Sequence, residues 1–463
     1  MQNPQGLVRG LGLLAAMSIN IANIIGTGVF LKARVMTCNV DTPAAVLGAW
    51  LAAALLVTAG ALTYAELGAM MPAAGGEYVF LRETYGRRFA FLYGWTYFFL
   101  ARGGALAAQA VASAIFLNIV TGGALNAVRF EAGPVKLGGL QAVSTLALVL
   151  TALLNCAAVQ STGRIAIALT IFKTVAVAAV GVAGFLAVRG DWANYGLINS
   201  GGACEGVAAG ARGGWAGFGA AMLGALWGFH GWANLAPLVG EVRDPQRNIP
   251  RAFLGAIVVV AALYLFANAS YFYVLTPTEI ASVSLDSSVA MEVIRNYLGP
   301  MAAGLMAGVM MISSLGAIHA GMASGARVPF AMARDGLFPE ILGKVSGAHV
   351  PVCSVLLTAG WSVVLALSGS YDKLTDSAMF AHWMFFGLAA VALVLLRRRD
   401  PGAPRPYRVP GYPVVPGLFA LITLGVLAST VYSAPWQSLA GLALMLVSLP
   451  VYWILERRSE RSQ

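Results

Sequence analysis

Two short glycine-containing stretches interrupt apolar runs that are otherwise long enough to cross a membrane as helices. They are NIIGTGVF, residues 23–30, and WGFHGWAN, residues 227–234. Glycine costs about 1 kcal/mol relative to alanine in a helix interior, and the β-branch of threonine disfavours a helix further. A helix that breaks at such a point leaves free N–H groups at the start of one half and free C=O groups at the end of the other.

These backbone groups could bind a small ligand that carries two opposite charges close together. N–H groups near Thr27 and Gly28 lie at the positive end of a helix dipole and suit a carboxylate. Carbonyl oxygens of Ile24 and Ile25, with those of the second stretch across the site, suit an ammonium group. The sequence therefore predicts a site for the head group of an α-amino acid. The residues expected to form it are Ile24, Ile25, Gly26, Thr27, Gly28, Trp227, Phe229, His230 and Gly231.

Lys173 lies deep within another apolar run, in the sequence TIFKTVAVAAVG. A buried ammonium group is costly unless it is paired or functional. A lysine near a membrane surface can extend its charge into water, but Lys173 lies too far inside the run 164–188 for that. We therefore expect a functional role for Lys173.

The composition is that of a membrane protein. Of the 463 residues, 59% are hydrophobic and 10% are charged, and the mean hydropathy is +0.77, whereas about a quarter of the residues in a soluble protein are charged. The net charge of +10 comes mainly from basic residues in short connections between apolar runs. This pattern indicates a cytoplasmic face that includes both termini, rather than a nucleic-acid partner. No nucleotide-binding loop, nucleophile elbow or HExxH pattern occurs, so we expect neither enzyme activity nor a cofactor or metal.

Apolar runs of about twenty residues, the length that crosses a bilayer, recur along almost the whole chain. They predict an all-α integral membrane protein with twelve spans: 10–36, 43–71, 88–119, 138–159, 164–188, 215–242, 250–275, 292–326, 351–369, 373–396, 413–432 and 436–455. The two interrupted runs each begin a block of five helices, and because five is odd the second block is inverted. Close helix packing could explain either interruption alone, but the matched pair favours a transport site at the middle of the membrane. The expected parts of this single transporter domain are a first repeat (1–190), a second repeat (191–399), and two further helices with a tail (400–463).

Several motifs resemble the amino acid–polyamine–organocation superfamily of transporters. They are IIGTGVF, YAELGAMMPAAGGEYVFLRETYG (64–86), GFHGWANLAPLVGEVRDPQRNIPRA (228–252), ARDGLFP (333–339) and RRRDPGAPRPYRVPGYPVVP (397–416). The Gly-Trp pair in the second interruption resembles the sequence of the L-type amino acid transporter branch and its bacterial relatives at this place. The resemblance covers nearly the whole chain. It implies twelve helices in the 5+5 inverted-repeat fold, with substrate held at the breaks in helices one and six.

The resemblance also implies roles for particular side chains. Lys173 matches the lysine of helix five whose ammonium group stands where sodium-coupled relatives hold a sodium ion, which argues against sodium dependence. It would bond carbonyl oxygens of helix one and a hydroxyl of helix eight, that of Ser313 or Ser314. Trp227 matches an aromatic ring that covers the substrate from outside, with a packing role as the alternative. His230 departs from the family, which usually has glycine or aspartate there.

Other polar residues within the runs have structural as well as functional interpretations. Arg102 lies near mid-membrane without an obvious partner, and Glu66 could join basic loop residues in a network that stabilises one gate state. His230 could titrate near neutral pH or bond a neighbouring helix. His319 and His382 are weaker candidates for a side-chain pocket.

The four cysteines show no metal-ligand spacing. Cys38 and Cys204 could both face outward and form a disulfide, but sequence alone does not establish their proximity. Animal relatives carry a cysteine between spans three and four that links a heavy subunit. The corresponding segment here, residues 120–137, has none, so we expect no covalent heavy subunit.

The central parts of spans one, three, eight and ten contain no Asp or Glu. A cationic amino acid or a polyamine would need a carboxylate there, because an unpaired charge in that environment is costly. The sequence therefore predicts a secondary transporter in the inner membrane that exchanges neutral L-amino acids by alternating access. Proton symport, with Lys173 or His230 titrating, and a sensor that binds without transporting are the alternatives.

Overall fold

The structure consists mainly of helices, with bounds as follows. The first part of the chain forms α1 (Leu13–Ile24), α2 (Gly28–Val40), α3 (Pro43–Met70), α4 (Glu77–Tyr85), α5 (Arg87–Thr96), the π-helix η1 (Tyr97–Arg102), α6 (Gly103–Val120), η2 (Ala124–Ala127), α7 (Gly139–Asn155), α8 (Val159–Phe185) and η3 (Trp192–Gly196). The second part forms η4 (Ala209–Ala211), α9 (Gly214–Gly228), η5 (Ala236–Glu241), α10 (Pro245–Val274), α11 (Pro277–Ala281), α12 (Val289–Leu298), α13 (Met301–Gly325), α14 (Arg327–Arg334), η6 (Glu340–Gly343), α15 (Val352–Ser368), α16 (Tyr371–Arg399), α17 (Val414–Ser433) and α18 (Pro435–Arg461). This computed structural model describes residues 5–132, 135–186, 190–285, 287–368, 371–433 and 435–461.

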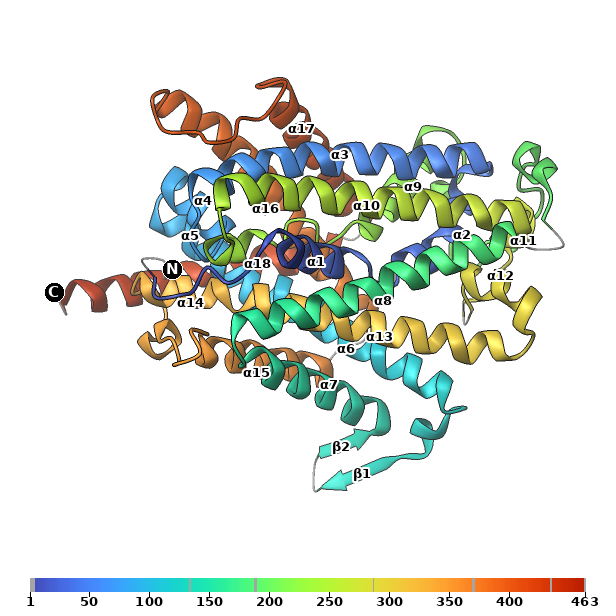
Figure 1. The fold of residues 1–463 in the computed structure, drawn as a ribbon, viewed down its shortest axis with the longest axis horizontal. Helices are drawn as coiled ribbons and strands as arrows, with labels where there is room; N and C mark the ends of the chain where they lie inside the picture. Colours follow the sequence, from blue (N-terminus) through green and yellow to red (C-terminus); the bar gives the residue numbers. More distant parts are fainter. Residues whose placement is uncertain are drawn as a thin grey trace.

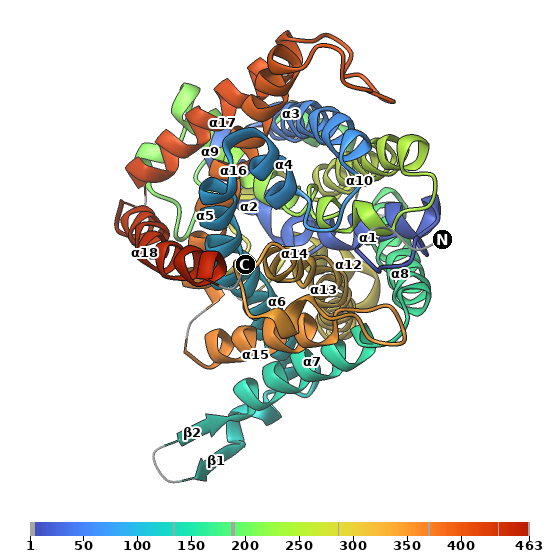
Figure 2. The same ribbon diagram turned by 90° about the vertical axis from the view of Figure 1, so that its left-hand side faces the viewer.

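The long helices lie side by side along one direction (Figure 1). The first described residues and the end of α18 lie at the same end of this bundle, which we call the terminal end; the opposite end, where α2 and α11 finish, is the distal end. Seen along the bundle, α17 and α18 lie at its periphery, outside α16 and α5 (Figure 2). Residues 1–4 and 462–463, whose cytoplasmic position the sequence also predicts, lie outside the described residues.

Six stretches of helix among the described residues are long and apolar enough to cross a membrane, and one bent pair makes a seventh. The six are Pro43–Met70, Arg87–Val120, Val159–Phe185, Pro245–Val274, Met301–Arg334 and Val414–Val431, and the bent pair is α1 with α2. Shorter apolar helices occupy Gly139–Asn155, Val352–Ser368 and Gly441–Glu456. These helices agree with a multi-pass membrane protein, while the count of twelve spans stays a prediction.

The interruption predicted within the run 215–242 is present, but the chain does not resume as an α-helix after it. Helix α9 ends at Gly228, turns follow, and the chain resumes only as the short 3₁₀-helix η5. Gly231 has a positive φ of +99°, which a helix cannot accommodate. Pro237 near the start of η5 lacks the N–H group that a preceding helical turn would need.

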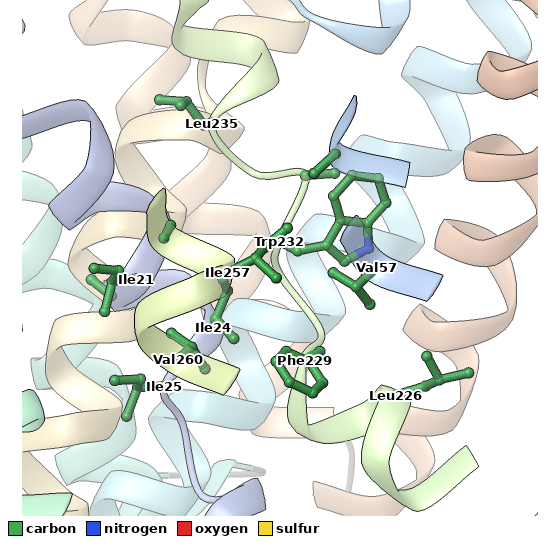
Figure 3. Packing of buried hydrophobic residues seen from close by; sticks show 14 of the residues in the cluster. Ile21, Ile24, Ile25, Val57, Leu226, Phe229, Trp232, Leu235, Ile257 and Val260 are labelled. Atoms are coloured by element: carbon green, nitrogen blue, oxygen red, sulfur yellow. The ribbon is translucent and has the colours of Figure 1, made fainter. Parts of the chain in front are cut away.

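A buried apolar cluster holds this unwound segment in place (Figure 3). Phe229 and Trp232 point from it toward different neighbours. Phe229 packs edge-on against Trp50 of α3, with ring centroids 5.9 Å apart, and Trp232 packs against Tyr64 of the same helix at 4.9 Å. Both side chains are fully buried, so the segment has a fixed path although its backbone hydrogen bonds are those of turns, such as Trp232 to Phe229 and Asn234 to Gly231.

Two other features differ from or extend the sequence prediction. The segment after α6, predicted as a plain connection in an all-α protein, contains an antiparallel hairpin of β1 (Arg129–Ala132) and β2 (Val135–Gly138). Cys38, near the end of α2, forms a disulfide with Cys204 in the loop before η4. This bond ties α2 to the loops of the distal end, a link that the sequence had left open.

Candidate functional site

The first interruption divides the first span into α1 and α2, whose axes differ by 44°. Ile25 adopts an extended conformation after the last turn of α1, and Thr27 stands at the N-cap position of α2. The first N–H groups of α2 therefore have no carbonyl oxygen one turn earlier in the same helix. The break predicted at Gly26-Thr27-Gly28 is present, with the donor end of α2 directed into the middle of the bundle.

The second interruption meets the first. A Cβ atom on Gly28 would lie 2.7 Å from the Cα atom of Gly228, and one on Gly231 would lie 2.5 Å from the carbonyl oxygen of Asn23. Real Cβ atoms essentially never approach other atoms so closely. The glycines are therefore required because two unwound backbones touch.

A small cavity of about 50 Å³ lies at this meeting point. Five of its ten lining residues belong to the predicted head-group site: Ile24, Gly26, Gly28, Trp227 and His230. The others are Asn23, Ala105, Ala108, Gln109 and Gly228. Sequence reasoning missed the face of α6 that contributes Ala105, Ala108 and Gln109, although small residues three apart followed by a lone glutamine in an apolar run were a visible signal.

The remaining predicted residues lie beside the cavity rather than in its wall. The carbonyl oxygen of Ile25 faces Lys173, Phe229 packs in the apolar cluster, and Gly231 contacts Asn23. Thr27 lines a second, larger cavity. All nine predicted residues therefore lie in or beside the small cavity, but they contact different neighbours.

The second cavity has a volume of about 400 Å³ and lies on the distal side of the breaks. Residues of α2, α6, α12 and α13 line it, including Thr27, Leu31, Phe116, Met291 and Met310. Ala112 in its wall lies about one helical turn beyond Ala108 in the wall of the small cavity. The two cavities therefore follow one another along α6, from the distal end toward the middle of the bundle.

Tyr264 of α10 connects the two breaks. Its Oη atom lies 3.2 Å from the carbonyl oxygen of Ile24 and 3.1 Å from that of Gly228. These are carbonyl groups at the ends of α1 and α9, which lack a partner within their own helices. Tyr264 is fully buried, and no pattern in the sequence distinguishes it from the other tyrosines.

Lys173 of α8 is also directed at the end of α1. Its Nζ atom donates to the carbonyl oxygens of Ala22 at 2.8 Å and Ile25 at 2.7 Å, and the side chain is 1% exposed. A cation at a helix C-terminus is favourable because the helix dipole is negative there. The Ser313 hydroxyl donates to the same Ile25 oxygen at 3.2 Å, whereas the buried Ser314 hydroxyl has no hydrogen-bond partner among the described residues.

Trp227 and His230 of the second break have distinct neighbours. Trp227 is half-buried in the cavity wall, and the Nζ atom of Lys32 lies 4.8 Å from its ring centroid. His230 packs edge-on against His382 of α16, with ring centroids 4.7 Å apart. His319 faces away from the cavity, with its Nδ1 atom 3.0 Å from the Asn155 side chain.

Arg102 and Glu66 both have partners on the terminal side of the breaks. Arg102 is buried and donates to the Tyr97 hydroxyl at 2.9 Å and to the side-chain oxygen of Asn234, the last residue of the second interruption. Glu66 accepts from Arg397 Nε at 2.8 Å and from the backbone N–H of Val409 at 2.6 Å. The predicted network around Glu66 is therefore present.

A bundle of membrane-crossing helices with two broken helices that meet at a central cavity defines a multi-pass membrane transporter. The chain matches the family model described as "Amino acid permease" over residues 11–454, and it belongs to that family. The predicted superfamily, and the interpretation as a transporter rather than an enzyme, are confirmed.

Curated relatives match over nearly the whole chain. The serine/threonine exchanger SteT of Bacillus subtilis (strain 168) is 29% identical over 457 residues, covering 98% of each protein. The cystine/glutamate transporter of Homo sapiens is 27% identical over 450 residues, 97% of this chain and 85% of the relative. The large neutral amino acids transporter small subunit 2 of Homo sapiens is 27% identical over 460 residues, 97% of this chain and 80% of the relative.

Proposed function

We propose that this protein is a secondary transporter that exchanges neutral L-amino acids across the inner membrane without sodium. The observation that carries the proposal is the direct contact of the two breaks at Gly28 and Gly228 around a cavity. Backbone donors of α2 bind the substrate carboxylate, and carbonyl oxygens at the ends of α1 and α9 bind its ammonium group. Relatives described as exchangers and as neutral amino acid transporters support the same activity.

A neutral side chain suits the cavity because its described wall contains no carboxylate. Its polar side chains are those of Asn23, Gln109, Trp227 and His230. A cationic amino acid or a polyamine would remain without a counter-charge there, which is costly in a buried site. The small volume of about 50 Å³ favours a small substrate.

Sodium independence rests on Lys173. Its Nζ atom holds two carbonyl oxygens of α1. A sodium ion would need oxygen ligands of this kind, and the lysine already uses them. Lys173 therefore acts in place of a coupling ion, with Ser313 completing the contact to Ile25.

Alternating access accounts for the unequal packing of the two sides. The 400 Å³ cavity gives the site a distal approach, whereas buried ion pairs and hydrogen bonds close the terminal side. The Arg327–Glu241 pair, with Nε to Oε1 at 2.7 Å, and the Arg397–Glu66 pair join helices that must separate for release. We assign the terminal end to the cytoplasm, which makes both termini cytoplasmic.

The proposal includes the finer architecture. Twelve helices form two inverted five-helix repeats, residues 1–190 and 191–399, followed by two further helices in 400–463. A small-molecule amino acid and the lipid bilayer are the expected partners. No covalent heavy subunit is expected, because residues 120–137 contain no cysteine to link one.

Exchange in proteoliposomes tests this function. We expect uptake of labelled serine, alanine or leucine only when unlabelled amino acid is present inside, at the same rate in sodium and in potassium buffer. Uptake into empty vesicles driven by an imposed pH gradient would instead establish proton symport. Binding without any flux would establish a sensor, and preferential exchange of lysine or a polyamine would overturn the neutral substrate class.

A further inference from the structure

Three buried carboxylates lie on the terminal side of the breaks, and one differs from the other two. Glu66 and Glu241 are each paired with an arginine. Glu77, the first residue of α4, is 3% exposed and has no ion-pair partner among the residues that the structure describes. An unpaired ionised carboxylate in such a place is costly, so this group is poised to bind a proton.

The turn before α4 fixes Glu77 against the second break. Gly75 and Gly76 have φ values of +115° and +53°, and the N–H group of Gly75 donates to the carbonyl oxygen of Pro237 at 3.0 Å. A Cβ atom on Gly76 would lie 2.5 Å from the backbone of Ala236. The turn that precedes Glu77 is therefore held directly against η5, the continuation of the unwound segment.

A polar chain leads from Glu77 to the small cavity. The Tyr93 hydroxyl donates to Glu77 Oε2 at 3.2 Å. The ring centroids of Tyr93 and Tyr97 lie 5.3 Å apart. Arg102 donates to the Tyr97 hydroxyl and to Asn234.

The same chain ends in the wall of the cavity. The side-chain amide of Asn234 donates to Asn23 Oδ1 at 3.2 Å, and Asn23 lines the cavity. The Arg102–Asn234–Asn23 contact, which we call the clasp, thus joins the third span to both broken helices.

We propose that Glu77 is a proton-binding site that controls the clasp: ionised Glu77 holds the terminal side closed through Arg102, and protonated Glu77 releases it. Arg102 is a buried cation whose hydrogen-bond partners in the described structure are neutral. Glu77 attracts it electrostatically without forming an ion pair. Protonation removes that attraction and leaves Arg102 less stabilised in the closed arrangement. This inference rests on the proposed transport function.

Burial raises the pKa of Glu77 to about 7, against the opposing effects of hydrogen bonds from its own backbone N–H and from Tyr93, and of the Arg102 charge. The Tyr64 hydroxyl of α3 faces the carboxylate and also favours its ionised form. The carboxyl group therefore changes its charge within the physiological range. Sites with such a pKa are often functional.

The other charged groups on the elements packed against α4 are either partnered or exposed. On α5, Arg87 donates to the carbonyl oxygen of Asp335 and Arg88 faces Tyr452. Arg334 of α14 and Arg398 and Arg399 of α16 are exposed.

Arg327 of α14 and Glu241 of η5 pair with each other, and Arg397 of α16 pairs with Glu66. On α4 itself Arg82 pairs with Glu83 and with Asp335 after α14. His382 of α16 packs edge-on against Tyr97 and His230. Glu77 thus has Arg102 as its charged neighbour among the described residues.

The test measures amino acid exchange by the full-length protein in proteoliposomes, with equal pH on both sides, between about pH 6 and pH 8. Over this range the protonated fraction of a group with a pKa near 7 falls about tenfold, so we expect the exchange rate of the unaltered protein to fall by up to about tenfold. Glu77→Gln should keep the faster rate throughout. Glu83→Gln, on the exposed face of the same helix, is the matched control and should follow the unaltered profile.

A second variant guards against a folding defect in Glu77→Gln. Tyr93→Phe removes the hydrogen bond that stabilises the ionised carboxylate but keeps the ring, so it should move the midpoint of the profile to higher pH. Retention of the unaltered pH profile by both Glu77→Gln and Tyr93→Phe would overturn the proposal.

Infrared difference spectra between the two pH values separate this inference from the transport function. The protonated-carboxyl band of the unaltered protein should be absent from Glu77→Gln. A band that titrates near neutral pH in a protein that exchanges nothing would refute the transport function and leave the proton site standing. Active exchange with a band that persists in Glu77→Gln would refute the proton site and leave transport standing.

Discussion

Gly28 and Gly228 meet backbone to backbone, since a Cβ atom on Gly28 would lie 2.7 Å from the Cα atom of Gly228. The contact joins the start of α2 to the end of α9, two ends that lie some 200 residues apart in the sequence. Residues of both ends line one small cavity. This approach supports the proposed head-group clamp made of backbone groups.

The clamp predicts a strict requirement at Gly28. Gly28→Leu should abolish exchange, because the side chain would push the two broken helices apart, and Gly28→Ala should reduce it at least tenfold. Thr27→Ser should be tolerated, since the backbone rather than the Thr27 side chain holds the carboxylate. Gly48→Ala, at a helical glycine with open space around it, is the control for initial-rate exchange measurements. Normal exchange by Gly28→Leu would refute the clamp.

Lys173→Ala should impair both stability and exchange. Removal of the ammonium group leaves the buried carbonyl oxygens of Ala22 and Ile25 without their donor, at a cost of about 1–3 kcal/mol. We expect a lower Tm of the detergent-purified protein and loss of counterflow. Lys344→Ala, at an exposed position, should change neither. Unchanged exchange together with unchanged uniport in Lys173→Ala would refute the proposed role of this lysine.

The sequence alone identified residues that are energetically unfavourable in their local surroundings. It did not identify residues whose role depends on contacts between distant parts of the chain. Glycine within an apolar run, and a lysine far inside another, are unfavourable locally, so 26–28, 227–234 and Lys173 could be selected without a structure. The partner of Arg102 could not, because Asn234 reaches it only once the second break has folded. Tyr264 is one tyrosine among 15, and only its position between α1 and α9 distinguishes it.

The same limit explains why the sequence did not show that the run 215–242 resumes only as a short 3₁₀-helix after its predicted interruption. Its hydropathy fits a continuous span, yet Gly231 and Pro237 interrupt the helix and buried rings hold the unwound path. Burial against neighbouring helices satisfies the apolar side chains whether or not the backbone is helical. An apolar run therefore predicts burial more securely than it predicts a helix.

Tyr264→Phe isolates the hydroxyl that touches both breaks. The ring would keep its edge-on packing against Trp50 at 5.1 Å, while the contacts to the Ile24 and Gly228 oxygens would be lost. Loss of about 1 kcal/mol corresponds to about a fivefold decrease in exchange rate or substrate affinity. Tyr195→Phe, which removes a hydroxyl bonded to Ala269 outside the cavity, serves as the comparison. Equal effects of the two variants would show that Tyr264 has no special part in the clamp.

The disulfide between Cys38 and Cys204 predicts the orientation of the protein in the membrane. Disulfides persist in oxidising compartments and are rare in the cytosol, so the distal end should face outward and the terminal end the cytoplasm. Mass spectrometry after alkylation without reduction should give a linked Cys38–Cys204 peptide, whereas Cys156 and Cys353, which are not in a disulfide, should be alkylated. Cys38→Ser should release Cys204 for reaction with a membrane-impermeant maleimide added to intact cells. Labelling of Cys204 only after the cells are permeabilised would reverse the proposed orientation.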